Sequence, residues 1–262
     1  MPRFARALLT GVALLGATVA TPAAADSPKP AGGWKFEVSP YFWLAGISGD
    51  IELQSRLGGG GSISVGVDQK FGDIFQDISA IPFMGMIEAS YDRFTLIGDI
   101  LYLQVESEAS TPGPAFGGAE VRLTNTIGSL VGTYRAVEDR RYSLEFGGGF
   151  RVWSFSTRAA LTPGLLSGGV AEKSATWVDP ILAGRLRGRL TDRLALSLYG
   201  DVGGFGVGSE FAWQVTGTLD YAPTDWLELK LGYRYLSVDY EGDRARYDLN
   251  FHGPFLAASF KF

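Results

Sequence analysis

Charged residues stand inside otherwise apolar segments of this chain, and their spacing offers the first indication of chemistry. Arg151 lies between Phe150 and Val152, and Asp179 between Val178 and Pro180. A charge kept from bulk water is costly unless it is paired. We therefore expect these side chains to share an enclosed interior. The acids of the set are Glu37, Glu88, Asp99, Glu145, Asp179, Asp201, Asp220 and Glu228; the bases are Lys35, Arg135, Arg151, Arg185, Arg187, Arg189, Lys230, Arg234 and Lys261.

Two kinds of chemistry fit such a set. Rings of charge can form a constriction that selects ions or solutes. A near balance of acids and bases can instead build a structural network of ion pairs, which is the interpretation that we favour. Glu145 and Arg151 are six residues apart, about 20 Å along an extended strand. They cannot pair with each other, so each should find its counterpart on a neighbouring strand.

The chain has a single histidine, His252, and a hydrolase of the Ser–His–acid type would depend on it. No such arrangement can be read from the sequence, so we expect a non-enzymatic protein without metal or cofactor, and keep a hydrolase using His252 as the weaker alternative. The acidic residues Asp239, Glu241, Asp243 and Asp248 indicate a solvated tip rather than a defined cation loop. The glycine-rich run 203–209 does not open a helix, so it predicts a strand end entering a loop rather than a nucleotide site.

The elements that carry these residues alternate with period two. From Tyr142 to Val152 the apolar side chains fall on every second position, and the same holds from Leu256 to Phe262. A soluble barrel would also alternate. Charges in mid-strand, and aromatic residues gathered near the short turns, favour an apolar face in contact with lipid.

The connections between these strands come in two lengths. Short polar turns are predicted at residues 91–94, 137–140, 191–193 and 222–225, and longer Gly- and Pro-rich segments near 107–119, 158–173, 203–209 and 240–246. Short and long connections alternate in this way in outer-membrane barrels. The short turns should share the periplasmic end with the carboxy terminus.

The sequence therefore predicts an all-β fold, an antiparallel transmembrane β-barrel of about ten strands, with eight or twelve as alternatives. Residues 49–79 are expected to form an elaborated first extracellular loop, with a hairpin that includes Ile63 to Val67 and a helical turn or two at 71–78. In the alternative function, this loop is a surface binding or adhesion module with Phe71 and Phe75 as contacts.

The first 25 residues have the layout of a secretory signal peptide. Arg3 and Arg6 precede an apolar run from Ala7 to Ala20, and a cut is expected before Asp26. Residues 26–33 would then be a short linker, and 34–262 the barrel. Loss of the two arginines changes the formal charge from −5 to −7, which argues against nucleic acid as a partner. The chain contains no cysteine, which excludes thiol chemistry and disulfides.

The last strand resembles the assembly signal of bacterial outer-membrane barrels, because it ends in an aromatic residue after strict alternation. Its residues are Leu256, Ala258, Phe260 and Phe262. Segments 38–46, 177–180, 201–209 and 232–236 resemble a group of uncharacterised proteobacterial outer-membrane β-barrel proteins, of small porin-like or OmpA-type architecture.

The resemblance implies an outer-membrane location in a Gram-negative bacterium. It implies contact with outer-membrane lipid, lipopolysaccharide and the barrel-assembly machinery, and we expect a monomer. It says little about activity. Our expectation is a narrow porin-like or structural envelope protein with a charge-paired lumen. The residues expected to form its constriction or network are Glu37, Glu88, Asp99, Glu145, Arg151, Asp179, Arg185, Arg187, Asp201, Glu228 and Arg234.

Overall fold

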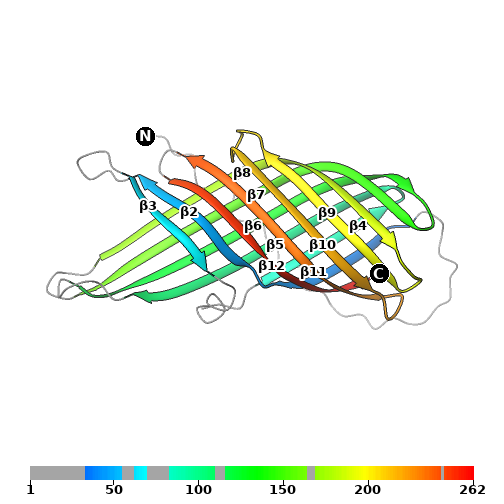
Figure 1. The fold of residues 1–262 in the computed structure, drawn as a ribbon, viewed down its shortest axis with the longest axis horizontal. Helices are drawn as coiled ribbons and strands as arrows, with labels where there is room; N and C mark the ends of the chain where they lie inside the picture. Colours follow the sequence, from blue (N-terminus) through cyan, green and yellow to red (C-terminus); the bar gives the residue numbers. More distant parts are fainter. Residues whose placement is uncertain (1–32, 55–61, 70–82, 110–115, 164–168, 243–244) are drawn as a thin grey trace. The chain divides into compact units, whose positions relative to one another are not determined.

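The computed structural model describes residues 33–54, 62–69, 83–109, 116–163, 169–242 and 245–262 (Figure 1). The expected signal peptide, residues 1–25, lies outside the described residues. All the described elements are β-strands. They are β1 Lys35–Trp43, β2 Gly46–Gln54, β3 Ser62–Gln69, β4 Phe83–Tyr91, β5 Phe94–Ala109, β6 Phe116–Glu138, β7 Tyr142–Pro163, β8 Gly169–Arg189, β9 Leu194–Gly204, β10 Phe211–Tyr221, β11 Leu227–Gly242 and β12 Ala245–Lys261.

The strands form one closed antiparallel barrel. β1 pairs with β4 on one side and with β12 on the other, which closes the sheet. β2 continues the path of β1 and pairs with the earlier part of β12, from Ala245 to His252, so β1 and β2 together make a single wall strand. β3 is an additional strand that pairs with β2. The wall therefore has ten strands, and the expectation of a ten-stranded barrel is confirmed.

The extents of several strands differ from the expectation. The first wall strand runs on to Gln54 instead of ending near residue 48. Residues 107–119, 158–173 and 240–246 were expected to be loops, but strand pairing continues to Ala109 and Ala119, to Leu161 and Gly169, and to Gly242 and Ala245. Gly and Pro are local turn signals, and here the register of a long hairpin overrides them.

The short turns were predicted correctly, and the hairpin within the first loop in part. Tyr91 pairs directly with Phe94 across a two-residue turn, in which Asp92 has a φ of 51°. Ile63 to Val67 lie in β3, paired with β2 as a hairpin. The helical turn expected at 71–78 lies outside the described residues.

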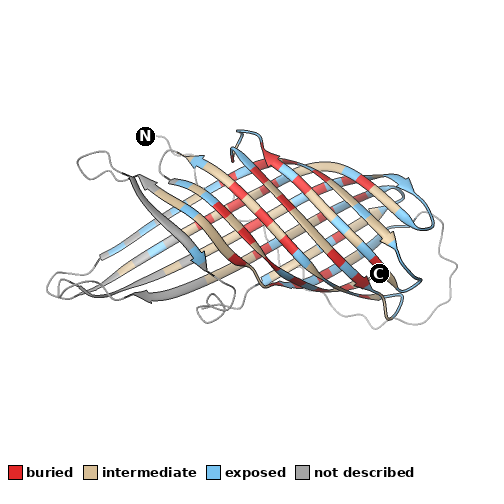
Figure 2. Cartoon of the chain, in the orientation of Figure 1, coloured by how far each residue is buried: buried red, intermediate tan, exposed pale blue. Residues whose placement is uncertain are grey.

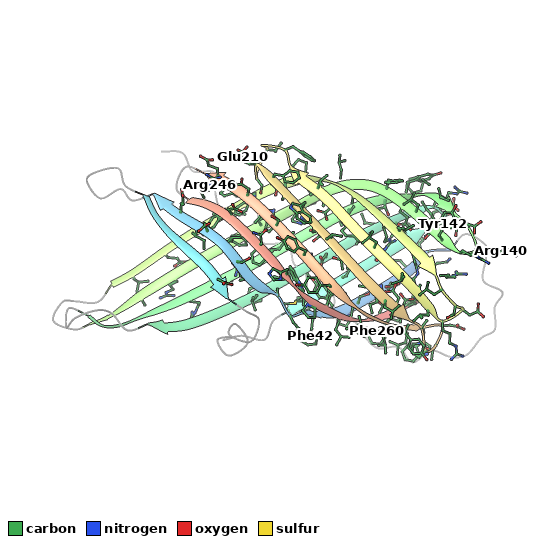
Figure 3. All side chains as sticks on the ribbon, viewed as in Figure 1. Phe42, Arg140, Tyr142, Glu210, Arg246 and Phe260 are labelled. Atoms are coloured by element: carbon green, nitrogen blue, oxygen red, sulfur yellow. The ribbon has the colours of Figure 1, made fainter. Side chains whose placement is uncertain are left out.

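Burial alternates along the strands as the sequence pattern predicts (Figure 2). Outward-facing apolar side chains remain exposed, Leu182 and Leu231 each at 61%. Exposed aromatic residues mark the end that carries the short turns, where Tyr142 lies close to Arg140 (Figure 3). An apolar outer band with an aromatic rim is what a barrel needs in lipid.

No helix in the described ranges is long and apolar enough to cross a membrane.

The inward-facing residues fall into two groups. One consists of charged side chains, which dominate from the short-turn end to the middle of the barrel. The other is a cluster of buried apolar and aromatic residues contributed by strands around the wall, including Trp43, Trp153, Trp177 and Phe251. Both groups come from the face of each strand that is turned away from lipid.

Candidate functional site

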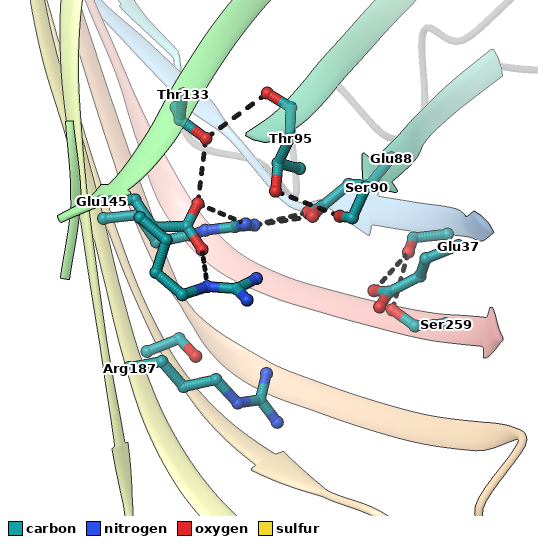
Figure 4. A network of polar contacts seen from close by, with 12 residues as sticks. Glu37, Glu88, Ser90, Thr95, Thr133, Glu145, Arg187 and Ser259 are labelled. Carbon is teal, nitrogen blue, oxygen red and sulfur yellow. Dashed lines mark hydrogen bonds and ion pairs between the residues drawn. The ribbon is translucent and has the colours of Figure 1, made fainter. Parts of the chain in front are cut away.

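The centre of the candidate site is an ion-pair network around Arg185. Figure 4 labels its partners Glu88 and Glu145. Arg185 on β8 donates to Glu88 on β4 at 2.7 Å and to Glu145 on β7 at 2.8 Å. Arg135 on β6 also contacts Glu145, with Nε 3.2 Å from Oε1, and the Thr133 hydroxyl donates to the same carboxylate at 2.9 Å. β5, β6 and β7 separate β4 from β8 along the shorter path round the wall. The Arg185–Glu88 pair therefore spans the lumen.

A second network lies nearer the short turns and surrounds Glu228 on β11. Its carboxylate accepts from Arg187 on β8 at 2.9 and 2.7 Å, and from Lys261 on β12. Lys230 bridges to Glu37 on β1 at 2.7 Å. Glu228 is only 1% exposed, so its carboxylate needs partners within the protein. In this network Arg187, Lys230 and Lys261 supply the positive charges that pair with Glu228 and Glu37.

A third group centres on Arg234 of β11. Its Nη2 lies 2.9 Å from Asp99 of β5, and Nη1 donates to Tyr41 of β1 at 3.2 Å. The Tyr41 hydroxyl in turn donates to Asp99 at 2.7 Å. The guanidinium also lies over the Trp43 ring, 4.8 Å from its centroid. Because β5 and β11 stand on different sides of the wall, this pair is a second bridge across the lumen.

Arg151 and Asp201 form the most completely buried pair. Arg151 Nη2 lies 2.7 Å from Asp201 Oδ2, and both side chains are 0% exposed. Arg151 Nε also donates to Ser129 at 3.0 Å. The partner of Arg151 was expected on an adjacent strand, and this is wrong: Asp201 is on β9, two strands from β7. Long arginine side chains reach over the intervening strand inside a narrow barrel.

Asp179 was also expected to pair with a cation, and this is wrong, because its hydrogen-bond donors are neutral groups. Its carboxylate accepts from Trp153 Nε1 at 2.7 Å, from the backbone N–H of Ser209 at 2.6 Å and from the Ser209 hydroxyl at 2.7 Å. Arg151 is its register partner on β7 but forms its ion pair with Asp201. Alternation predicts which face a residue occupies; it does not predict which group will meet it there.

Aromatic side chains cluster on the inner face beyond the charged region. Trp177 of β8 stacks on Tyr240 of β11 with centroids 3.8 Å apart, and on Trp153 at 5.8 Å. Tyr247 and Phe155 meet edge to face at 5.6 Å. The Trp177–Tyr240 contact joins β8 and β11, which β9 and β10 separate, so ring stacking links strands across the interior here as ion pairs do elsewhere.

These aromatic residues were missed at the level of the sequence, although a signal existed. Trp153 is two residues from Arg151, and Trp177 two residues from Asp179, so each shares the inward face of a residue already singled out. Ten of the eleven residues expected to form the network enter ion pairs. Asp179 is the exception among them.

His252 lies on the outward face of β12. Its Nδ1 is 2.8 Å from the Tyr233 hydroxyl, and its ring stacks on Tyr235 at 5.7 Å. The hydrolase alternative needed this ring at the rim of the lumen beside a serine or an acid. The structure places it on the outward face of the wall, beside these two tyrosine rings.

The acidic tip is more extensive than expected. Asp248 on β12 lies in register between Asp239 on β11 and Asp50 on β2, and Arg246 lies 3.7 Å from Asp239. Within the described residues, no group of three His, Cys, Asp or Glu side chains is arranged to hold a metal ion.

Together, the wall and its interior define a class: an antiparallel transmembrane β-barrel with ion pairs and stacked aromatic side chains on its inner face. The sequence matches no family model and no curated protein. The proposed membership of the uncharacterised proteobacterial group therefore stays a prediction.

Comparison with solved structures finds bacterial β-barrels. The translocator domain of the autotransporter NalP from Neisseria meningitidis is 11% identical, with a TM-score of 0.40, over 87% of this chain and 86% of that one. Ail, the attachment invasion locus protein of Yersinia pestis, is 12% identical (TM-score 0.36; 88% and 99% covered). The Pseudomonas putida toluene transporter TodX is 10% identical (TM-score 0.33; 90% of each). These values describe a distant likeness, so the fold rests on this chain's own strand pairing.

Proposed function

We propose that this protein is an integral, non-enzymatic outer-membrane barrel with a structural role in the envelope, and that its charge-paired lumen is closed to ions at rest. The observation that carries the proposal is the pair of bridges across the lumen, Arg185 to Glu88 and Arg234 to Asp99. An open porin keeps a water-filled path between its walls. Here the two bridges occupy that path.

The chemistry of the interior supports a structural role. Breaking one partner of a buried ion pair costs about 3–5 kcal/mol, because a charge is then left without compensation. The networks connect β1, β4, β5, β6, β7, β8, β9, β11 and β12 by ion pairs. Such a lattice holds the wall together from within and resists widening.

The location is supported by the chain's own surface. The outward band is apolar, and aromatic residues such as Trp34, Tyr91 and Phe94 stand exposed near the short turns. This arrangement suits a bilayer with headgroups at the level of the aromatic rim. Lipopolysaccharide and the assembly machinery as partners, and the monomeric state, belong to the same proposal.

Planar-bilayer conductance of the refolded protein tests the closed lumen. We expect no steady open-channel current from the wild type. The variant that replaces both bridges, Arg185→Ala with Glu88→Ala and Arg234→Ala with Asp99→Ala, should conduct, because it removes each bridge as a whole pair and leaves none of these four charges unpaired. Arg140→Ala, at an exposed turn, is the matched control and should remain closed. A steady current from the wild type would show an open porin and overturn the structural proposal.

A surface binding module remains the second candidate. The observation in its favour is the β2–β3 hairpin, which has eight paired positions, from Ile47 to Gln54 on β2. Phe71 and Phe75, its expected contact residues, lie outside the described residues.

A further inference from the structure

The height of the barrel wall changes sharply at β9 and β10. These strands have 11 residues each, whereas β8 has 21 and β11 has 16. β8 pairs with β9 from Ile181 onward, although β8 itself begins at Gly169. The wall therefore drops from β8 to β9 (Figure 1), whereas β11 continues for only three residues, Tyr240 to Gly242, beyond its last pair with β10. The β9–β10 loop, residues 205–210, lies at the lower edge of this step.

The loop is fastened to β8 through one residue. Ser209 is fully buried and donates twice to Asp179, at 2.6 and 2.7 Å, while its hydroxyl accepts from Trp177 Nε1 at 2.8 Å. Gly208 lies so close that a Cβ there would be 2.5 Å from Asp179 Oδ1 and 2.9 Å from Trp177 Cδ1. Position 208 therefore requires glycine for the loop to pack this closely against β8.

The β9–β10 loop has aromatic surface on its inner side and apolar surface on its outer side, unlike an ordinary polar loop. Behind it stands the indole of Trp177, which the loop contacts through Gly208 and Ser209. The indole of Trp153 donates to the same Asp179 carboxylate that holds the loop. In front of it, Phe205 and Val207 are 51% and 73% exposed. The neighbouring outward residues Val202 and Phe211 belong to the apolar outer band. Aromatic surface inside and apolar surface outside are separated here by a single loop.

The loop also carries backbone strain. Phe205 has a φ of 54°, a left-handed conformation that a bulky residue rarely adopts, and Gly204 and Gly206 flank it with φ of 86° and 72°. A strained turn persists only when its surroundings hold it. In this loop the restraint includes the hydrogen bonds between Ser209 and Asp179. Those bonds come from neutral donors, so weakening Asp179 should release the loop.

We propose that residues 205–210 form a flap, latched by Asp179, that opens sideways between the outer leaflet and the aromatic part of the lumen, so that a small planar apolar molecule can take the place of the Tyr240 ring on the indole of Trp177. The proposal rests on the closed lumen described above, because the ion pairs would form the floor of this compartment. Access would be lateral and would not require an ion-conducting path.

The test uses cells that express the barrel in a Gram-negative host, with N-phenyl-1-naphthylamine as the planar apolar probe. Asp179→Asn keeps the size of the side chain but turns an amide N–H₂ toward donors. Loss of one hydrogen bond to a charged group shifts an open–closed equilibrium about tenfold, so probe entry should quicken by about that factor. Asp192→Asn, the same change at an exposed turn, should leave entry unchanged.

A reversible lock provides the second arm. The chain has no cysteine, so Asp179→Cys with Ser209→Cys introduces a single thiol pair where the present side chains are 2.7 Å apart. Oxidised, the pair should reduce probe entry to that of cells without the barrel. Reduced, it should match Asp179→Asn. If Asp179→Asn fails to assemble, the contrast between oxidised and reduced protein carries the test.

Two further readouts separate the outcomes. Entry of the hydrophilic substrate nitrocefin to a periplasmic β-lactamase should not change in any variant; a parallel rise would mean a general leak and overturn the flap. Equal probe entry in wild type, Asp179→Asn and both states of the lock would overturn it as well. Steady ion conductance of the wild type would refute the closed lumen, whereas the flap is judged by the probe alone.

Discussion

At the scale of single residues, the interior depends on pairs whose partners come from distant strands. Arg151 and Asp201 are both fully shielded, and Asp201 Oδ1 and Arg151 Nη1 make no further hydrogen bond to the described residues. A guanidinium and a carboxylate in such a position depend on each other. Removing either one leaves a bare charge in a dry interior, which is the costly case.

Arg151→Ala should therefore lower stability by about 3–5 kcal/mol. The joint replacement Arg151→Met with Asp201→Leu should recover most of this loss, because it removes both charges and keeps the volume filled. The thermal midpoint of the folded band on a denaturing gel measures both. An unchanged midpoint in Arg151→Ala would show that water reaches the pair.

At the scale of strands, the sequence predicted the alternating faces, the four short turns and the number of wall strands. The predicted strand ends were wrong where they depend on pairing with a neighbouring strand, which local sequence does not encode. The Gly- and Pro-rich stretches near 107–119 and 158–173 contain turn signals, yet pairing between β5, β6, β7 and β8 carries them into long hairpins.

The candidate site was predictable to the same degree. Period two assigned Asp179 to the inward face, but the residue that meets it, Ser209, enters from a loop. Bridges such as Arg234 to Asp99 join residues 135 positions apart, which no periodicity encodes.

The last strand supplies a prediction of its own. Phe262 donates its N–H to the carbonyl of Phe36 at 2.9 Å and accepts from the Phe36 N–H at 3.3 Å, and its side chain is 76% exposed on the outer face. Phe262→Asp would put a charge on this apolar rim, so assembly should fail while export continues. Outer-membrane and periplasmic fractions of expressing cells measure the two steps.

Leu190→Asp is the matched control, because Leu190 is also exposed at the short-turn end but lies in a local turn. It should assemble normally. Wild-type yield of Phe262→Asp in the outer-membrane fraction would show that the terminal strand contributes no assembly signal.

At the scale of the whole molecule, the closed sheet predicts resistance to detergent. Every strand of the ten-stranded wall is paired on both sides, so the wall has no free edge. Unfolding by dodecyl sulfate therefore cannot begin at an unpaired strand. The unboiled protein should migrate differently from the boiled one on a denaturing gel. Identical migration before and after boiling would contradict a closed barrel.

The pairing of β1 with β12 also has a kinetic consequence. Glu37 meets Lys261, so the hydrogen bonds that complete the cylinder join the two ends of a stretch of more than two hundred residues. Closing so long a loop carries a large entropic cost, and non-local contacts of this kind slow folding. The neighbouring hairpins can form early and locally. Before the first and last strands pair, the chain is a curved sheet with two open edges. This open sheet is the folding intermediate most exposed to aggregation, and it is the form that a chaperone would have to protect.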